Sequence, residues 1–491
     1  MTSVAMPNTG RPASASAIFL VAAVSLLPVL ALFIVGQGTL LRMAVPAGAV
    51  LVGLVLYFRH PIGYFHFTLW TWFLTPFVRR LVDWRTGFED HNLVLATPML
   101  VSAIAVLTLL RERQVPRGIR LTPFFLCISA ILYGFAVGIV RIRLHASETA
   151  STGEVVFALF NWLAPIVFGL HLYFHWPEYE EYKQAVQKSF LWVCLLLGAY
   201  GVYQFVNPPV WDTYWLQHML SDIGAESFGR PDAFQVRVWS TSNSPGVFAN
   251  ILVAGLLLLF FSKSKIKPLA VGAGYCAFLL TLVRASWLGW LVGLVVVSRN
   301  SQGRQISRIL LSLLLLPALI APLMLNPQIA TIVTERLQTF QAPGQDVSLN
   351  ERTDGYRVLL SSLASDPFGE GISNAGYLHG YPMDNGIIPI FCYFGWIGAA
   401  FFLAGITLCV PTMPPGHRSA DLLTPVYQAI VIAMLVELLS GNTLIGPSGA
   451  ILWTCIGLGF SEREADRVAE VSSNDAGTLP AGSRTASVLA S

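Results

Sequence analysis

The chain has 491 residues, of which 54% are hydrophobic and 12% charged, and its formal net charge is +3. Because soluble domains carry roughly 25% charged residues, this composition and a mean hydropathy of +0.62 exclude an ordinary soluble protein. The small net charge gives no indication of nucleic-acid binding. Many apolar runs reach about 17–25 residues, which is enough for a helix to cross a bilayer. We therefore predict an all-α polytopic membrane protein.

The apolar runs follow one another along most of the chain. Residues 1–16 are polar and are expected to form a disordered cytoplasmic end, and no cleavage site marks the first run as a signal peptide. Between residues 17 and 460 we count about fourteen crossings. The tail 461–491 is rich in Ser, Ala, Gly, Asp and Glu and is expected to be disordered. The predicted crossings are 17–36, 39–58, 62–78, 93–110, 121–140, 155–174, 189–206, 244–262, 268–283, 284–298, 308–325, 386–410, 424–441 and 445–460.

The distribution of basic residues predicts the orientation. Clusters of Lys and Arg lie at 111–120, 263–267 and 298–308, and such clusters favour the cytoplasmic side. With the amino terminus inside, this places the periplasmic loop 207–243 and the large periplasmic loop 326–385 outside, and the tail inside.

Arginines gather on the predicted outer side with no lysine beside them. The planar guanidinium suits bidentate binding of phosphate. The alternative is contact with anionic lipid headgroups, which we favour for Arg141 and Arg143. The arginines concerned are Arg79, Arg80, Arg85, Arg141, Arg143, Arg237, Arg284, Arg336, Arg352 and Arg357.

Two of these arginines stand in unusual surroundings. Arg284 interrupts an apolar stretch that fits two short helices meeting at the arginine, so its charge should face a cavity; the alternative is an interfacial anchor. Arg237 precedes Asn243, Ser244 and Pro245, which together resemble the start of a helix. Free N–H groups at such a start also favour an anion, although an ordinary capped helix with a surface arginine explains the pattern equally well.

The stretch 351–398 concentrates polar residues directly before an apolar run. It carries Arg352, Arg357, His379 and Asp384. Asp384 is a candidate base for deprotonating a hydroxyl group, and the alternative is a helix cap. His379 is the weaker candidate base, because it lies among Gly, Tyr and Pro in a loop.

Four stretches, in this order, resemble segments of the O-antigen ligase and Wzy-type polymerase superfamily. The resemblance covers most of residues 60–410, and each motif is weak when it is taken alone. The stretches are PFVRRLVDWRTGFEDHNLVLATPML, RVWSTSNSPGVFAN, LTLVRASWLGWL and FGEGISNAGYLHGYPMDNGIIPIFCYFGWIG.

The resemblance implies a fold, a reaction and a location. The fold would be a GT-C-like helical bundle in the bacterial inner membrane, with a large periplasmic loop over a lateral cavity. The reaction would join sugar chains from an undecaprenyl-diphosphate-linked oligosaccharide donor to an acceptor, without metal or cofactor, at the periplasmic face. By analogy Arg237 and Arg284, with Arg352 and Arg357, would bind the diphosphate. The lipid bilayer is the other partner, and chain-length regulators or export proteins are candidates.

Three functions remain open at this point. Ligase members usually carry histidine before the asparagine of the loop, where this chain has Asp384, and this departure favours a polysaccharide polymerase. An O-antigen ligase acting on a lipid A-core or protein acceptor is the first alternative. A flippase for lipid-linked oligosaccharide is the second, although we see no repeated halves and no paired broken helices.

Overall fold

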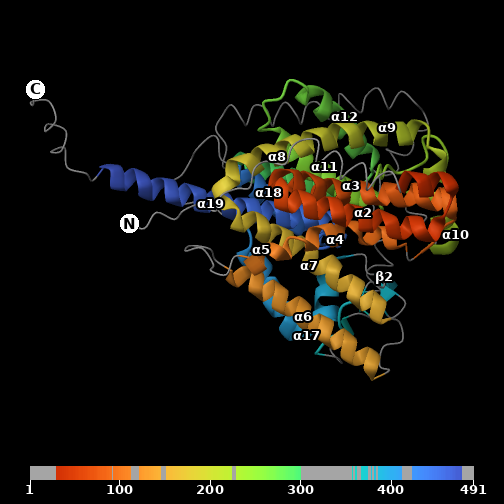
Figure 1. Ribbon diagram of the computed structural model, residues 1–491, viewed down its shortest axis with the longest axis horizontal. Helices are drawn as coiled ribbons and strands as arrows, with labels where there is room; N and C mark the ends of the chain where they lie inside the picture. Colours follow the sequence, from red (N-terminus) through yellow and green to blue (C-terminus); the bar gives the residue numbers. More distant parts are fainter. Residues whose placement is uncertain are drawn as a thin grey trace, which may run out of the picture.

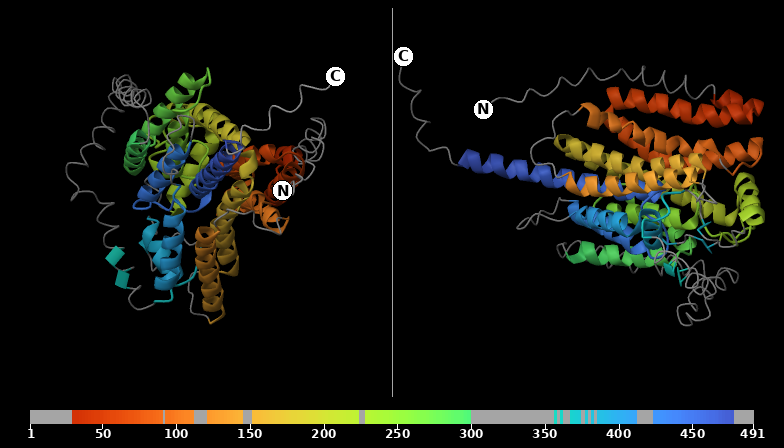
Figure 2. Two further views of the ribbon diagram at one scale, coloured as in Figure 1. Left: turned by 90° about the vertical axis from the view of Figure 1, so that its left-hand side faces the viewer. Right: turned by 90° about the horizontal axis from the view of Figure 1, so that it is seen from below.

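The computed structural model describes residues 29–90, 92–111, 121–144, 151–223, 228–299, 356–357, 360–361, 367–373, 377–378, 381–382, 385–411 and 423–477. The described chain is mostly helical, as the sequence predicts. Most of the helices run side by side, and α6 and α17 form a pair at one edge with α7 beside them (Figures 1 and 2).

Helices α2, α6 and α7 follow the predicted runs 39–58, 121–140 and 155–174, whereas α3 extends beyond the predicted end at 78 and the run 93–110 is divided among η1, α4 and α5. A π-helical segment joins α8 to α9 without a break. The elements are α2 Gly38–Arg59, α3 Pro61–Thr86, η1 Leu93–Ala96, α4 Thr97–Ala103, α5 Val106–Arg111, α6 Thr122–Arg143, α7 Thr152–Phe174, η2 Trp176–Glu178, α8 Tyr179–Trp192, the π segment Val193–Leu197, α9 Gly198–Val206 and α10 Val210–Ile223.

The carboxyl-terminal half adds shorter helices and a small hairpin. The strands β1 and β2 are antiparallel, with Tyr377 opposite Pro382. The elements are α11 Pro245–Leu259, α12 Lys267–Leu280, α13 Arg284–Arg299, β1 Tyr377–Leu378, β2 Tyr381–Pro382, α17 Ile387–Leu408, α18 Thr424–Glu437 and α19 Gly446–Gly477.

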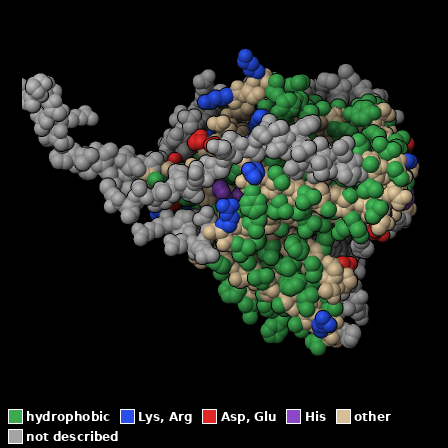
Figure 3. All heavy atoms as spheres, viewed as in Figure 1, with side chains coloured by type: hydrophobic (Ala, Val, Ile, Leu, Met, Phe, Trp, Pro, Cys, Tyr) green, Lys and Arg blue, Asp and Glu red, His purple; other side chains and the backbone are tan. Residues whose placement is uncertain are grey.

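Among the residues that the structure describes, six helical stretches are long and apolar enough to cross a membrane. They begin at residues 38, 93, 122, 152, 176 and 387, and hydrophobic side chains cover much of the face seen in Figure 3. The described chain is therefore consistent with a multi-pass membrane protein. The count of fourteen, the orientation and the GT-C-like fold stay predictions, and the predicted run 308–325 lies outside the described residues.

Contacts between helix ends and connecting segments lie at two opposite ends of the bundle. At one end, α3 contacts the segment before α11, and the start of α17 contacts the end of α18. At the other end, Tyr179 and Thr424 both donate hydrogen bonds to Glu462. The first group contains only segments that the basic residues predict to be outside, and the second only segments predicted to be inside.

One expectation about the connections needs correction. The tail is not disordered from residue 461, because α19 continues as a helix to Gly477 and extends beyond the bundle in Figure 1. The part of α19 that begins at residue 461 is held by Ser461, which donates to the Leu172 carbonyl at 2.9 Å, and by Glu462, which accepts from the Leu423 N–H. The predicted loop 207–243 contains α10, whose Asp212 and Trp215 are buried against the bundle.

Candidate active site

The segment between α10 and α11 is held in place by Arg80 on α3. The Arg80 side chain is buried, and its Nε lies 2.8 Å from Asp212 Oδ1. Its two terminal nitrogens donate to the carbonyls of Ser242 at 2.6 Å and Ser240 at 2.5 Å. Charge-assisted hydrogen bonds of this kind are among the strongest in proteins. Arg80 therefore fixes the backbone that follows Arg237.

Gln204 on α9 holds the same segment from the other side. Its Oε1 accepts hydrogen bonds from the backbone N–H groups of Trp239, at 3.1 Å, and Ser240, at 2.8 Å. Its Nε2 donates to Asp212 Oδ2, and the Tyr200 hydroxyl donates to the same oxygen, both at 2.7 Å. Ser240 has a φ of 51°, which is uncommon for a residue other than glycine. The surrounding hydrogen bonds hold this conformation.

Arg237 reaches the turn between α12 and α13. Its Nε donates to the Thr281 carbonyl at 3.2 Å, and its Nη2 donates to the Leu282 carbonyl at 3.4 Å. Leu282 also has a positive φ, 55°, and Arg284 opens α13 two residues later. The two helices meet at Arg284 as the sequence predicts. The structure thus places Arg237 and Arg284, both half-buried, at the same turn.

The start of α11 adds polar groups to this region. Ser244 is the N-cap and accepts from the Val247 N–H at 3.2 Å, with Pro245 in the first turn, which confirms the predicted helix start. Three side-chain atoms just before it, Thr241 Oγ1, Ser242 Oγ and Asn243 Oδ1, are buried and find no hydrogen-bond partner among the described residues. Unpartnered buried polar atoms call for an explanation, and a polar ligand at the positive end of α11 would supply one.

A polar network joins four helices beside Arg284. Ser286, in the first turn of α13, donates to Glu437 Oε2 at 2.9 Å. With its amide nitrogen toward Glu437, Asn250 of α11 donates to the same oxygen, and its own oxygen accepts from Ser448 Oγ of α19 at 3.1 Å. Glu437, the last residue of α18, is 4% exposed. None of the sequence motifs includes this carboxylate, although a single charge in the apolar run 424–441 is a usable signal.

The start of α17 lies against the end of α18. The Gly386 N–H donates to the Leu438 carbonyl at 2.8 Å. Asn385 Oδ1 accepts from the Ile388 N–H in the first turn of α17 at 2.9 Å. Whether Asp384 caps α17 or acts as a base is not decided by this contact. Asp384 itself lies outside the described residues, so its role as a base stays a prediction.

The segment 367–373 is wedged between α6 and α17. Backbone N–H groups of Glu370 and Gly371 donate to the carbonyls of Cys392, at 2.7 Å, and Tyr393, at 3.1 Å. These carbonyls are available because Gly395, with a φ of 60°, interrupts the helical backbone of α17. Gly371 has a φ of 84°, and a Cβ there would collide with the backbone of Gly138. Gly371 and Gly395 thus allow the segment 367–373 to pack directly against α6 and α17.

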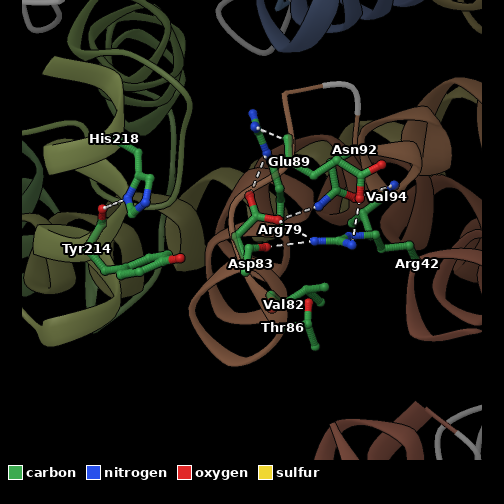
Figure 4. Close-up of polar contacts among 11 residues, drawn as sticks. Arg42, Arg79, Val82, Asp83, Thr86, Glu89, Asn92, Val94, Tyr214 and His218 are labelled. Atoms are coloured by element: carbon green, nitrogen blue, oxygen red, sulfur yellow. Dashed lines mark hydrogen bonds and ion pairs between the residues drawn. The ribbon is translucent and has the colours of Figure 1, made fainter. Parts of the chain in front are cut away.

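The first motif, PFVRRLVDWRTGFEDHN, forms a structural cluster, which Figure 4 shows. Arg79 Nε lies 3.0 Å from Asp83 Oδ2, and Asn92 donates to Asp83 Oδ1 at 2.6 Å. Arg42 of α2 lies 2.6 Å from Glu89 and 3.5 Å from Asp83. The interpretation of Arg79 and Arg80 as phosphate ligands is wrong, because both are buried and bound to protein groups.

The other predicted site residues are only partly described. Arg352 and His379 lie outside the described residues, although β1 and β2 flank His379. Arg357 is described and exposed. The structure therefore brings together Arg237, Arg284 and the chain entering α17, and adds Glu437 to them.

Comparisons with known proteins identify no similar protein. No family model matches the chain, and neither a curated protein nor a solved structure matches it. Within the ranges that the structure describes, no group of three His, Cys, Asp or Glu residues is arranged to hold a metal ion. Metal independence stays a prediction.

Proposed function

We propose that the chain is a membrane glycosyltransferase of the polysaccharide polymerase type. It would join oligosaccharide units carried on undecaprenyl diphosphate at the periplasmic face. The observation that supports this most is the meeting of separate motif segments: the Arg237 guanidinium is hydrogen-bonded to the turn that leads into Arg284. The family resemblance implies a diphosphate role for these two arginines, which come from separate motif stretches.

The proposed chemistry suits this arrangement. A diphosphate leaves readily once its negative charge is neutralised, and fixed arginines supply that neutralisation where charge develops. The starts of α11 and α13 add the positive ends of two helix dipoles. The acceptor hydroxyl then needs positioning and a weak base. Ligation to a different acceptor would use the same donor site, so the acceptor distinguishes polymerase from ligase.

The test uses the full-length protein in proteoliposomes with a lipid-linked oligosaccharide and a strong chelator. We expect longer glycans and free polyprenyl diphosphate to appear together. A flippase would move the donor between leaflets and leave it intact, and a ligase would use the donor only when a separate acceptor is added. Either result would contradict the polymerase proposal. Activity that requires added magnesium or manganese would contradict the metal-free mechanism.

Arginine variants test the site itself. Arg237→Lys and Arg284→Lys each keep the charge and lose the planar fork. We expect each to lower the rate roughly a hundredfold or more, as the loss of one transition-state donor does. Arg141→Lys, at a predicted headgroup contact, is the control and should retain its activity. Normal polymerisation by both site variants, at equal amounts of folded protein, would refute the diphosphate role.

A further inference from the structure

One carboxylate oxygen of Glu437 forms no hydrogen bond with a described residue, which is unexpected if the side chain only connects helices. Oε2 accepts from Ser286 and from Asn250, whereas Oε1 has no hydrogen-bond partner among the described residues. Glu437 also forms no ion pair with a described residue. A buried carboxylate oxygen that is left unpaired is costly, and a glutamine would join the same helices without a charge. The free oxygen therefore points to a partner that arrives with the substrate.

The position of Glu437 fits a role in the transfer reaction. Its partner Ser286 lies two residues after Arg284 in the first turn of α13. Leu438, the residue after Glu437, accepts a hydrogen bond from the Gly386 N–H. Gly386 in turn lies two residues after Asp384. Gly289 leaves room for the carboxylate, because a Cβ at that position would lie 2.6 Å from Oε1. Glu437 thus lies between the helix of one proposed diphosphate ligand and the chain entering α17.

We propose that Glu437 is the base of the transfer reaction, an inference that rests on the proposed function. The oxygen of the acceptor hydroxyl bonds to the anomeric carbon of the donor sugar. The bond from that carbon to the diphosphate oxygen breaks, and its electron pair leaves with the polyprenyl diphosphate. The hydroxyl proton passes to Glu437 Oε1. Because Glu437 is shielded from bulk water, it would take the proton from the acceptor hydroxyl and not from a water molecule. Ser286 and Asn250 would keep the carboxylate oriented.

The test compares two substitutions of Glu437 in the full-length protein. Glu437→Gln keeps the length and the hydrogen bonds to Ser286 and Asn250 but removes the base. Glu437→Asp keeps a carboxylate at reduced reach. A base predicts that Gln lowers kcat about a hundredfold or more, with KM for the donor nearly unchanged, and that Asp retains more activity than Gln. A purely structural residue predicts the reverse order, which would overturn the proposal.

Two further measurements separate the possible failures. Glu462→Gln changes a buried glutamate at the opposite end of the bundle and should retain wild-type kcat. If Glu437→Gln folds poorly, Glu437→Ala with added formate replaces it; formate should restore turnover, and no restoration overturns the proposal. Loss of activity in Asp384→Asn, with Glu437→Gln active, would assign the base to Asp384. A wild-type protein that consumes no donor would instead refute the proposed function.

Discussion

Arg80 provides the sharpest test of how the proposed site is built. Its guanidinium is buried, pairs with Asp212 at 2.8 Å and donates to two carbonyls of the segment that follows Arg237. Arg80→Met keeps the length and removes the charge. Breaking a buried pair by removing one partner costs about 3–5 kcal/mol, because the remaining charge is left without compensation. We expect the free energy of unfolding to fall by that amount.

A double-mutant cycle isolates the Arg80–Asp212 interaction. Asp212→Asn alone leaves Arg80 without its carboxylate, whereas the double variant leaves neither charge uncompensated. The double variant should therefore be less destabilised than the sum of the single ones, by about 1–3 kcal/mol for residues in direct contact. Unfolding in detergent micelles, followed by tryptophan fluorescence, measures each free energy.

Arg85, also on α3, provides the control for this prediction. Arg85 is exposed and donates only to carbonyls near the amino terminus, at 3.3 and 3.0 Å, so Arg85→Met should change stability by less than about 1 kcal/mol. Arg80→Met should also lower polymerisation, because the backbone that follows Arg237 loses two donors. Two results would show that Arg80 does not hold the site. One is a double variant whose loss of unfolding free energy equals the sum for the two single variants within about 0.5 kcal/mol, and the other is full activity in Arg80→Met.

Two other substitutions test the framework. Gly371→Ala should lower the melting temperature and the yield, because its Cβ meets the Gly138 backbone and its φ is positive; Gly272→Ala, with open space around it, should be neutral or slightly stabilising, and equal stability of the two would contradict the wedge. Burial raises the pKa of Glu462, which lies beyond the predicted crossing 445–460, and hydrogen bonds from Thr424 oppose that shift. Stability from this group should therefore be complete below the unfolded pKa and decline as pH rises toward the folded pKa. Glu462→Gln should remove that decline in melting curves recorded upward from about pH 4, near the ordinary pKa of a glutamate.

The sequence predicted local features well and distant partners poorly. The apolar runs, the cap at Ser244 and the break before Arg284 depend on neighbouring residues, so their patterns are visible in the chain. The partner of Arg80 is Asp212 on another helix, and no local pattern connects them. Both arginines of the RR pair therefore looked like surface ligands, whereas the structure buries them.

The same difference explains the errors at the end of the chain. Composition alone predicted disorder after residue 460, but Ser461 and Glu462 make contacts with distant helices that keep the segment helical. Glu437 was missed for a related reason: its position beside Ser286 and Asn250 depends on three helices meeting. A lone acid in an apolar run gives a signal for function, but it does not indicate which residues surround it.

Burial separates the arginines of the motifs into two groups with different roles. Arg79 and Arg80 are adjacent on α3, and each is buried against protein carboxylates and carbonyls. Such arginines fix the fold, because they are enclosed among protein groups where a phosphate has no access to them. Arg237 and Arg284 are half-buried at a turn between two helices, where a ligand can approach. In the proposed site, Arg80 would set the backbone that follows Arg237, and the half-buried pair would meet the charge of the diphosphate.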